Sequence, residues 1–334
     1  MIVVFSPRYR IDIGPHVFPT DKYQRVHAHL LETGVIRSAD VVEPEPASWA
    51  DLALVHTTEY LERLRSGAVT PEDVQQLELP WSREMVEGFR LMTGGTIQAA
   101  LIACGLVHDD RTQNSQNTQS QASHSAVSAD SALNVVCHLG GGLHHAFPNH
   151  GEGFCPFNDV AVAVRVLQAR GLERVAIVDL DVHHGNGTAF IFESDPRVFT
   201  FSMHQQHNYP MWKPRGSLDI GLPDGAHDAA FLGELGRALP AVMAHRPQCV
   251  FYLAGADPYE DDQLGGLRLT KEGLRERDRV VIDAVRREGV PLVIALAGGY
   301  ARRVDDTVAI HSATIKEAAA ASGAGVRASP FDRS

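Results

Sequence analysis

The stretch VAIVDLDVHHGNG, residues 175–187, places a buried apolar run directly before two carboxylates, two imidazoles and two glycines. Side chains of an extended chain alternate between the two faces of a strand, so Asp179, Asp181 and His183 are expected to start on one side. A carboxylate and an imidazole two residues apart, at the end of a buried strand, form half of a zinc site. The stretch therefore predicts a strand that ends at a metal centre, which residues elsewhere in the chain must complete.

Length and composition are those of an ordinary globular protein. The chain has 334 residues, of which 44% are hydrophobic and 21% charged, and this is enough to bury a sizeable core. Its net charge of -11 gives no bulk electrostatic attraction to nucleic acid or to an anionic membrane. We therefore expect neither as a partner.

The four cysteines form no Cys-x-x-Cys pair and are expected to be reduced thiols. The N-terminus lacks a basic region followed by a long apolar region, so no signal peptide is predicted. No apolar run approaches the roughly 20 residues that span a bilayer. These features are typical of a cytoplasmic protein.

Strand and helix patterns alternate along the chain. Apolar runs predict strands at 2–5, 134–139, 175–181, 198–202, 249–253 and 291–296. Amphipathic or small-residue patterns predict helices at 23–31, 52–65, 93–106, 159–169, 231–243, 274–287 and 309–321. Such alternation predicts one α/β domain over residues 1–320, with a mostly parallel sheet covered by helices.

Two segments do not fit this alternation. Residues 108–133 are polar, almost uncharged and free of aromatics, so they cannot bury enough apolar area to offset the entropy of ordering. We interpret them as a loop insertion without chemistry of its own. Residues 321–334 are expected to form a flexible C-terminal tail.

Titratable side chains and glycines follow five of the predicted strands. In open α/β sheets the ligand site lies beyond the carboxyl ends of the strands, so these residues are expected to meet at one edge. They are His144 and His145, Asp181 and His183, Ser202 and His204, Asp257, and Tyr300. A structural protein has no reason to gather His, Asp and Gly at one edge of its sheet.

A hydrolytic zinc site commonly has three protein ligands and one open position. Asp181 and His183 supply two ligands, and Asp257 is the best candidate for the third because its strand should end at the same edge. Two carboxylates and one imidazole make zinc a weaker Lewis acid than three histidines would, so other groups must share the catalysis. This ligand set is also compatible with Fe²⁺.

Neighbouring imidazoles at His144 and His145 can flank a water molecule, so that one removes its proton while the other donates to a leaving amine. Each imidazole needs an acceptor on its far nitrogen, and Asp179 and Asn186 are available. Tyr300, after two glycines, can stabilise a tetrahedral oxyanion.

A glycine-rich segment after the histidine pair supplies the expected channel. Phe154, which follows Gly153, can line an apolar passage, and Asn158-Asp159 is expected to cap the next helix. Together with the histidine pair and the metal ligands, this predicts hydrolysis of an amide whose acyl group enters a narrow apolar tunnel.

The motifs that carry these residues resemble the zinc-dependent histone deacetylase superfamily over nearly the whole chain. They are GGGLHH (140–145), GFCPFND (153–159), VDLDVHHGNGT (178–188), AGAD (254–257) and AGGY (297–300). The resemblance implies a single-domain, three-layer α/β/α arginase/deacetylase fold with the active site at the C-terminal ends of the strands. Three further segments look like class IV deacetylases and their bacterial relatives: HVFPTDKY (16–23), NYP (208–210) and DPYEDDQLGG (257–266).

The resemblance also implies roles for individual residues. Zn²⁺ would be bound by Asp181, His183 and Asp257, and His145 rather than His144 would be the general base and acid. A structural K⁺ would be bound by Asp179, Asp181, His183, Ser202 and Met203. Tyr300 would polarise the substrate carbonyl. The channel would be formed by Gly153, Phe154 and Tyr209.

The chain departs from the family at three points. Asn186 stands where many members have Asp behind the second histidine, and His183-His184 looks more like classes I and II than class IV. No residue could be aligned with the carboxylate by which the family binds the substrate backbone.

The predicted activity is removal of acetyl or longer acyl groups from lysine-like amines on a protein or peptide. One alternative is an acetylpolyamine or other small-molecule deacetylase. The other is a homologue that senses a ligand without catalysis, although such proteins often lose a metal ligand or the tyrosine, and none is missing here. The sequence leaves the acyl length and the oligomeric state open.

Overall fold

The computed structural model describes residues 1–106 and 135–323, so the predicted insertion at 108–133 and residues 324–334 of the predicted tail lie outside the described residues. The described strands form one parallel eight-stranded sheet in the order β2-β1-β3-β8-β7-β4-β5-β6. The strands are β1 (Ile2–Val4), β2 (Val41–Val42), β3 (Val135–His138), β4 (Val175–Asp179), β5 (Val198–Gln205), β6 (Leu218–Leu222), β7 (Cys249–Leu253) and β8 (Leu292–Ala295).

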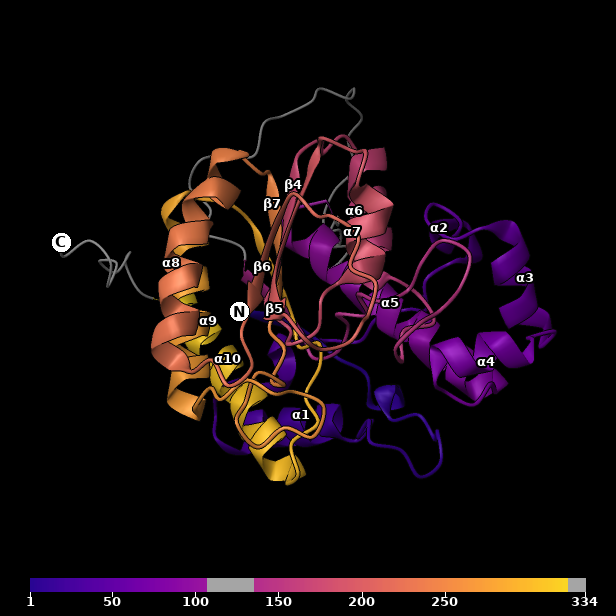
Figure 1. Cartoon of the computed structure of the whole chain (residues 1–334), viewed down its shortest axis with the longest axis horizontal. Coiled ribbons are helices and arrows are strands. Elements are labelled where there is room, and N and C mark those ends of the chain that lie inside the picture. Colours follow the sequence, from indigo (N-terminus) through magenta and orange to yellow (C-terminus); the bar gives the residue numbers. More distant parts are fainter. Residues whose placement is uncertain (107–134, 324–334) are drawn as a thin grey trace, which may run out of the picture.

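Helices cover both faces of the sheet and make the predicted three layers (Figure 1). On one side lie α1 (Lys22–Glu32), α8 (Asp228–Ala244), α9 (Lys271–Arg287) and α10 (Val304–Gly323). On the other lie α5 (Arg83–Ala103), α6 (Asp159–Ala169) and α7 (Asn186–Phe192), with α2 (Trp49–Leu52), α3 (Thr58–Ser66) and α4 (Pro71–Leu77) at the margin. Within the described ranges, no helix has the length and apolar character that crossing a membrane requires.

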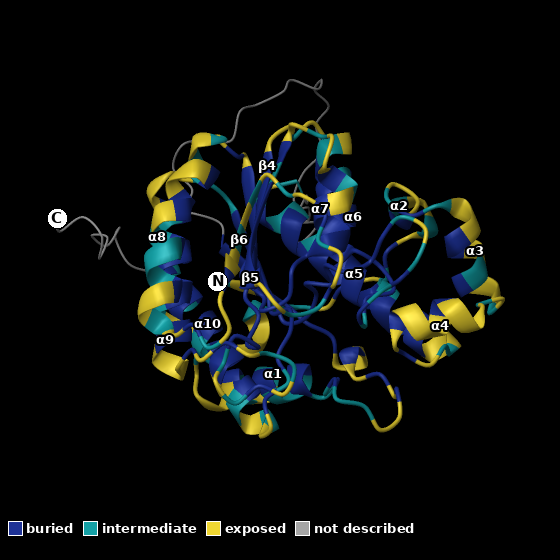
Figure 2. Ribbon diagram, viewed as in Figure 1, coloured by how far each residue is buried: buried dark blue, intermediate teal, exposed yellow. Residues whose placement is uncertain are grey.

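The sheet is buried because both of its faces are covered (Figure 2). Every residue of β3, β4, β7 and β8 is buried, as expected for parallel strands that read as continuous apolar runs. The strands end together, because Asp179 at the end of β4 pairs with Ser202 on β5 and with Leu253 at the end of β7. This register brings the loops after β4, β5 and β7 to one edge.

Some predicted boundaries were wrong. The helix predicted at 52–65 is two helices, since α2 ends at Leu52 and the Thr57 side chain caps the start of α3 by accepting from the Tyr60 amide. The helix predicted from residue 93 begins ten residues earlier, at Arg83, where Ser82 caps it. The predicted strand at 175–181 stops at Asp179, so Asp181 and His183 lie in the loop that follows. Strands β2 and β6 and helices α4 and α7 were not predicted.

The start of α6 fastens the loop that carries the histidine pair. Asn158 caps the helix as predicted, because its side chain accepts from the Ala161 amide at 3.0 Å. Asp159 reaches back and accepts from the Leu143 and Gly142 amides at 2.7 and 3.1 Å. Two carboxylate hydrogen bonds thus fix the backbone immediately before His144.

A buried ion pair on α9 supports the loop after β7. Arg277 is fully buried; its Nη2 donates to Asp278 Oδ1 at 2.8 Å and its Nη1 donates to the Gly255 carbonyl at 2.6 Å. Asp278 also accepts from the hydroxyls of Tyr252 and Thr314. The guanidinium therefore neutralises a buried carboxylate and holds the backbone two residues before Asp257.

We expect Arg277→Met to lower the free energy of unfolding by about 3–5 kcal/mol, because it leaves the Asp278 carboxylate buried without a counter-charge. The matched control is Arg275→Met, which removes a 2.7 Å ion pair to Glu317 from an arginine side chain that is 47% exposed, and should cost about 1 kcal/mol or less. Urea unfolding followed by circular dichroism measures both. Equal losses in the two variants would contradict the role given to Arg277.

Candidate active site

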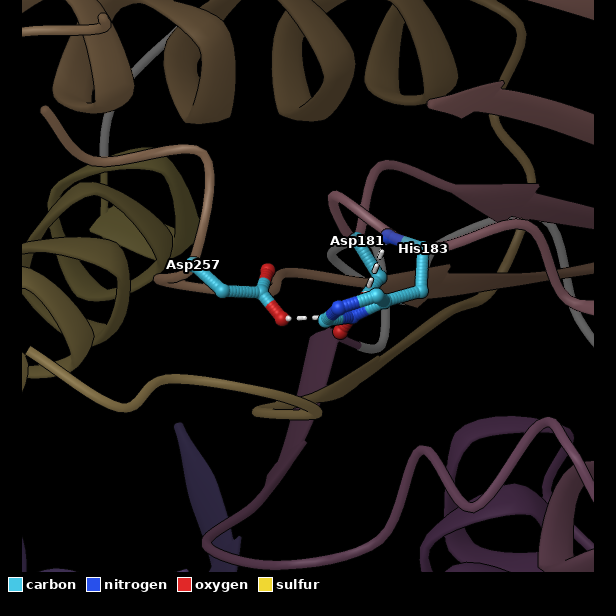
Figure 3. A group of neighbouring side chains, drawn as sticks. All are labelled: Asp181, His183 and Asp257. Carbon is cyan, nitrogen blue, oxygen red and sulfur yellow. Dashed lines mark hydrogen bonds and ion pairs between the residues drawn. The ribbon is translucent and has the colours of Figure 1, made fainter. Parts of the chain in front are cut away.

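The three predicted metal ligands converge at the sheet edge. Asp181 and His183 come from the loop after β4, and Asp257 comes from the loop after the neighbouring strand β7 (Figure 3). All three are buried, and one ligand atom from each lies within 4.8 Å of the others. His183 Nδ1 lies 3.0 Å from Asp181 Oδ1 and 3.4 Å from Asp257 Oδ2.

One oxygen of each carboxylate accepts from a backbone amide, and the other oxygen of each faces His183. Gly298 N donates to Asp181 Oδ2 at 2.9 Å, and Val182 N donates to Asp257 Oδ1 at 3.0 Å. Asp257 Oδ2 is buried without a hydrogen-bond partner in the described part of the chain. A Cβ on Gly298 would lie 2.0 Å from that oxygen, so only glycine fits here. This donor set fits a divalent cation.

The charges of the cluster also favour a bound cation. Burial and the neighbouring Asp181 raise the pKa of Asp257 to about 7. Burial disfavours an imidazolium, but the hydrogen bond to Asp181, the close contact with Asp257 and the charges of both carboxylates outweigh it and raise the pKa of His183 to about 10. The two buried carboxylates thus draw a proton onto His183, and a bound cation would take over the proton's place.

The two histidines face each other, and each has its own partner on Nδ1. His144 Nδ1 donates to Asp179 Oδ2 at 2.6 Å, and His145 Nδ1 donates to Asn186 Oδ1 at 2.7 Å. The two Nε2 atoms face each other at 3.1 Å. Since both Nδ1 atoms carry hydrogen, one further proton must lie between the Nε2 atoms to avoid opposed lone pairs.

The different partners decide which ring holds that proton. Burial disfavours the cation, but the charges of Asp179 and Asp181 and the hydrogen bond to Asp179 raise the pKa of His144 to about 9. Burial and the nearby His144 hold the pKa of His145 well below its usual value, because Asn186 adds no compensating charge. His144 is therefore the cation and His145 the neutral ring.

Tyr300 lines the site together with His183. Its ring centroid lies 6.5 Å from that of His183, and its backbone amide donates to Asp262 Oδ2 at 2.7 Å. Fully buried Lys22, which lies in the segment 16–23 but was given no role, donates from Nζ to the Ala297 carbonyl at 2.9 Å and lies 5.5 Å from the Tyr300 ring centroid. Lys22 thus fixes the backbone that leads into the tyrosine.

A cavity of about 170 Å³ leads to the metal ligands. Phe154 and Tyr209 both line this cavity, and the Tyr209 ring centroid lies 5.0 Å from that of His145. Phe154 has a positive φ of 65°, an unusual conformation for a bulky residue, at a turn that directs it into the channel. A second, smaller cavity of about 30 Å³ is lined by His144, His145 and Asp181.

Glu78 is a lining residue that sequence reasoning missed. It is the exposed C-cap of α4, with a left-handed φ of 57°, and it lines the same cavity as Tyr209 and Phe154. Its sequence neighbours carry no motif, because only the packing of α4 beside the channel brings it there.

Two of the predicted K⁺ ligands lie on neighbouring strands. Asp179 and Ser202 are register partners on β4 and β5, so their side chains are neighbours, but Ser202 Oγ also lies 3.0 Å from His204 Nδ1. The participation of Met203 and of the main chain stays a prediction.

Comparisons with known proteins agree with the predicted superfamily. The family model of the histone deacetylase domain matches residues 16–315. An uncharacterized protein of Picosynechococcus sp. is 40% identical over 93% of this chain and 95% of its own length. Histone deacetylase 2 of Arabidopsis thaliana is 30% identical over 92% of this chain and 77% of its own.

A solved structure shows the same fold. The crystal structure of an HDAC homolog complexed with SAHA has a TM-score of 0.75 at 24% identity, and the match covers 98% of this chain and 85% of that one. The single parallel sheet, the motifs at its edge and the matched domain agree, and the chain belongs to the histone deacetylase family.

Proposed function

We propose that this protein is a metal-dependent amidohydrolase that removes short acyl groups, acetyl above all, from lysine-like amines. The observation that carries the proposal is the buried Asp181–His183–Asp257 cluster at the end of an aromatic-lined channel, beside a histidine pair whose Nδ1 atoms face a carboxylate and an amide. Zn²⁺ suits the ligand set, and Fe²⁺ is compatible with it.

A divalent cation at the three ligands would polarise the amide carbonyl and acidify the attacking water. The chain's own residues would then move the protons. His145, neutral with Nε2 facing the site, accepts the proton of the water and later gives it to the leaving amine. The neighbouring His144 cation makes protonated His145 a strong acid, which favours release of the amine.

The other residues position the substrate. Phe154 and Tyr209 enclose the aliphatic part of the side chain and exclude water, and Tyr300 donates its hydroxyl to the developing oxyanion. Glu78 at the mouth offers an acceptor to a backbone amide or an attraction to a cationic amine. The latter keeps acylated polyamines as a second substrate class.

The proposal also includes a structural K⁺ and catalysis rather than ligand sensing alone. The neighbouring Asp179 and Ser202 support a structural K⁺ beside the catalytic metal. A complete set of ligands, histidines and tyrosine supports catalysis over ligand sensing alone.

We expect zinc-loaded wild-type protein to hydrolyse acetyl-lysine peptides, and Tyr300→Phe to lower kcat about 10²–10³-fold because an oxyanion donor is lost. Asp257→Ala should lose activity together with bound metal. The matched controls are Tyr259→Phe and Asp261→Ala, which change the same residue types outside the channel and should retain activity. Steady-state kinetics and metal analysis measure these effects; equal turnover in all five proteins would refute the proposal.

The pH dependence should report the charge of His144. Asp179 raises the pKa of this residue, so the protonated pair persists to higher pH and activity is lost as the pH rises through that pKa. In Asp179→Asn the loss should begin at a pH about one unit lower or more. The control Asp219→Asn removes a carboxylate 3.4 Å from His184 Nε2 instead. An alkaline limb of kcat/KM that does not move in Asp179→Asn would contradict this assignment.

The narrow inner space predicts a preference for short acyl groups. A cavity of about 30 Å³ accommodates a methyl group, whereas each extra methylene would displace packed side chains. We expect kcat/KM to fall about 5- to 150-fold from acetyl-lysine to octanoyl-lysine peptide, since overpacking costs about 1–3 kcal/mol. Equal or faster removal of octanoyl or myristoyl groups would show that the channel does not limit the acyl length.

A further inference from the structure

A second carboxylate lies behind the amide that supports His145. Asn186 Oδ1 accepts from His145 Nδ1 at 2.7 Å, and Asn186 Nδ2 donates to Glu152 Oε1 at 2.7 Å. An ionised carboxylate can only accept hydrogen bonds, so the amide group of Asn186 must direct its NH₂ end toward Glu152. Its oxygen end is then left for His145.

We propose that Glu152 is a positioning residue that fixes the amide orientation of Asn186, and through it the tautomer of His145, with hydrogen on Nδ1 and an unprotonated Nε2. The inference rests on the proposed function, because it concerns the ring that moves the proton. Glu152 was not among the predicted site residues, and its contact with Asn186 was not predicted.

The backbone holds Glu152 firmly in this place. Its amide donates to the Cys155 carbonyl at 3.2 Å and its carbonyl accepts from the Cys155 amide at 2.9 Å. Between them Gly153 and Phe154 both have positive φ, 52° and 65°, which makes a tight turn. The same turn therefore directs Phe154 into the channel and Glu152 toward Asn186.

The carboxylate has further partners that keep it charged. Tyr209 donates its hydroxyl to Glu152 Oε1 at 3.0 Å, and His150 Nε2 lies 3.4 Å from Oε2. Burial alone would raise the pKa of Glu152, but the hydrogen bonds from His150, Asn186 and Tyr209 hold it below its usual value. Oε1 of Glu152 thus contacts both Asn186, which is the partner of His145, and Tyr209, which lines the channel.

Without Glu152, the two ends of the Asn186 amide would compete for His145. A turned amide would present its NH₂ group to Nδ1 and favour the tautomer with hydrogen on Nε2, which cannot accept a proton from water. His144 does not need such a device, because Asp179 contacts it directly and offers only acceptors. Because Asn186 lies between Glu152 and His145, the Glu152 carboxylate can orient His145 without a charge in direct contact with the ring.

The test uses Glu152→Met, which keeps the side-chain length and lacks the carboxylate, with Glu152→Ala as a second variant. Both should lower kcat about 10–100-fold, as is typical when the partner of a metal-site histidine is removed. In both, ¹⁵N chemical shifts of the His145 ring in histidine-labelled protein should move from the Nδ1–H to the Nε2–H tautomer. Glu152→Gln keeps an acceptor for Asn186 and should restore most of kcat and the Nδ1–H tautomer.

The matched control is Glu193→Met, which makes the same change at an exposed glutamate at the end of α7. It should change neither kcat nor the tautomer. The proposal is overturned if Glu152→Met and Glu152→Ala retain the Nδ1–H tautomer, whatever their activity, or if Glu152→Gln behaves like Glu152→Met. The ring shifts need no substrate, so they test Glu152 even if acyl-lysine peptides are not turned over and the proposed function fails.

Discussion

Two buried carboxylates that face one imidazole are the constraint on which the site depends. Asp181 and Asp257 are each fixed by a backbone amide on one oxygen, and each presents its other oxygen to His183. The parallel sheet makes this arrangement possible, because β4 and β7 are neighbours whose carboxyl ends meet at one edge. The excess negative charge is stable only with a proton or a cation at the centre. Gly298, which has no room for a side chain, completes the cradle.

The same charge divides the work of the two histidines. His144 lies 2.6 Å from Asp179 and within 3.8 Å of Asp181, and is held as a cation. The Nδ1 of His145 contacts only the neutral amide of Asn186, and burial and the nearby His144 hold the pKa of His145 below its usual value. Two adjacent residues of one type thus acquire different properties from their partners alone, which is how enzymes separate acid and base roles.

Residues at the ends of strands could be predicted from the sequence, and those placed by other packing could not. The ligands and histidines followed apolar runs, and one rule about parallel sheets brought them together. Glu78, Glu152 and Lys22 lie at a helix end, in a turn and at a helix start, where no periodic pattern indicates direction. The helix predicted at 52–65 was wrong because its amphipathic spacing continued across the Thr57 cap. The class IV assignment stays a prediction.

The most direct test of the account is calorimetric titration of Zn²⁺ into metal-free protein at pH 7, in buffers of different ionisation enthalpy. The imidazole that lies between the two carboxylates holds a proton in the metal-free protein, since the pKa of His183 is raised to about 10. Metal binding requires a neutral ring nitrogen, so the account predicts one zinc ion per chain and the release of about one proton or more. Absence of saturable binding, or binding without proton release, would contradict it.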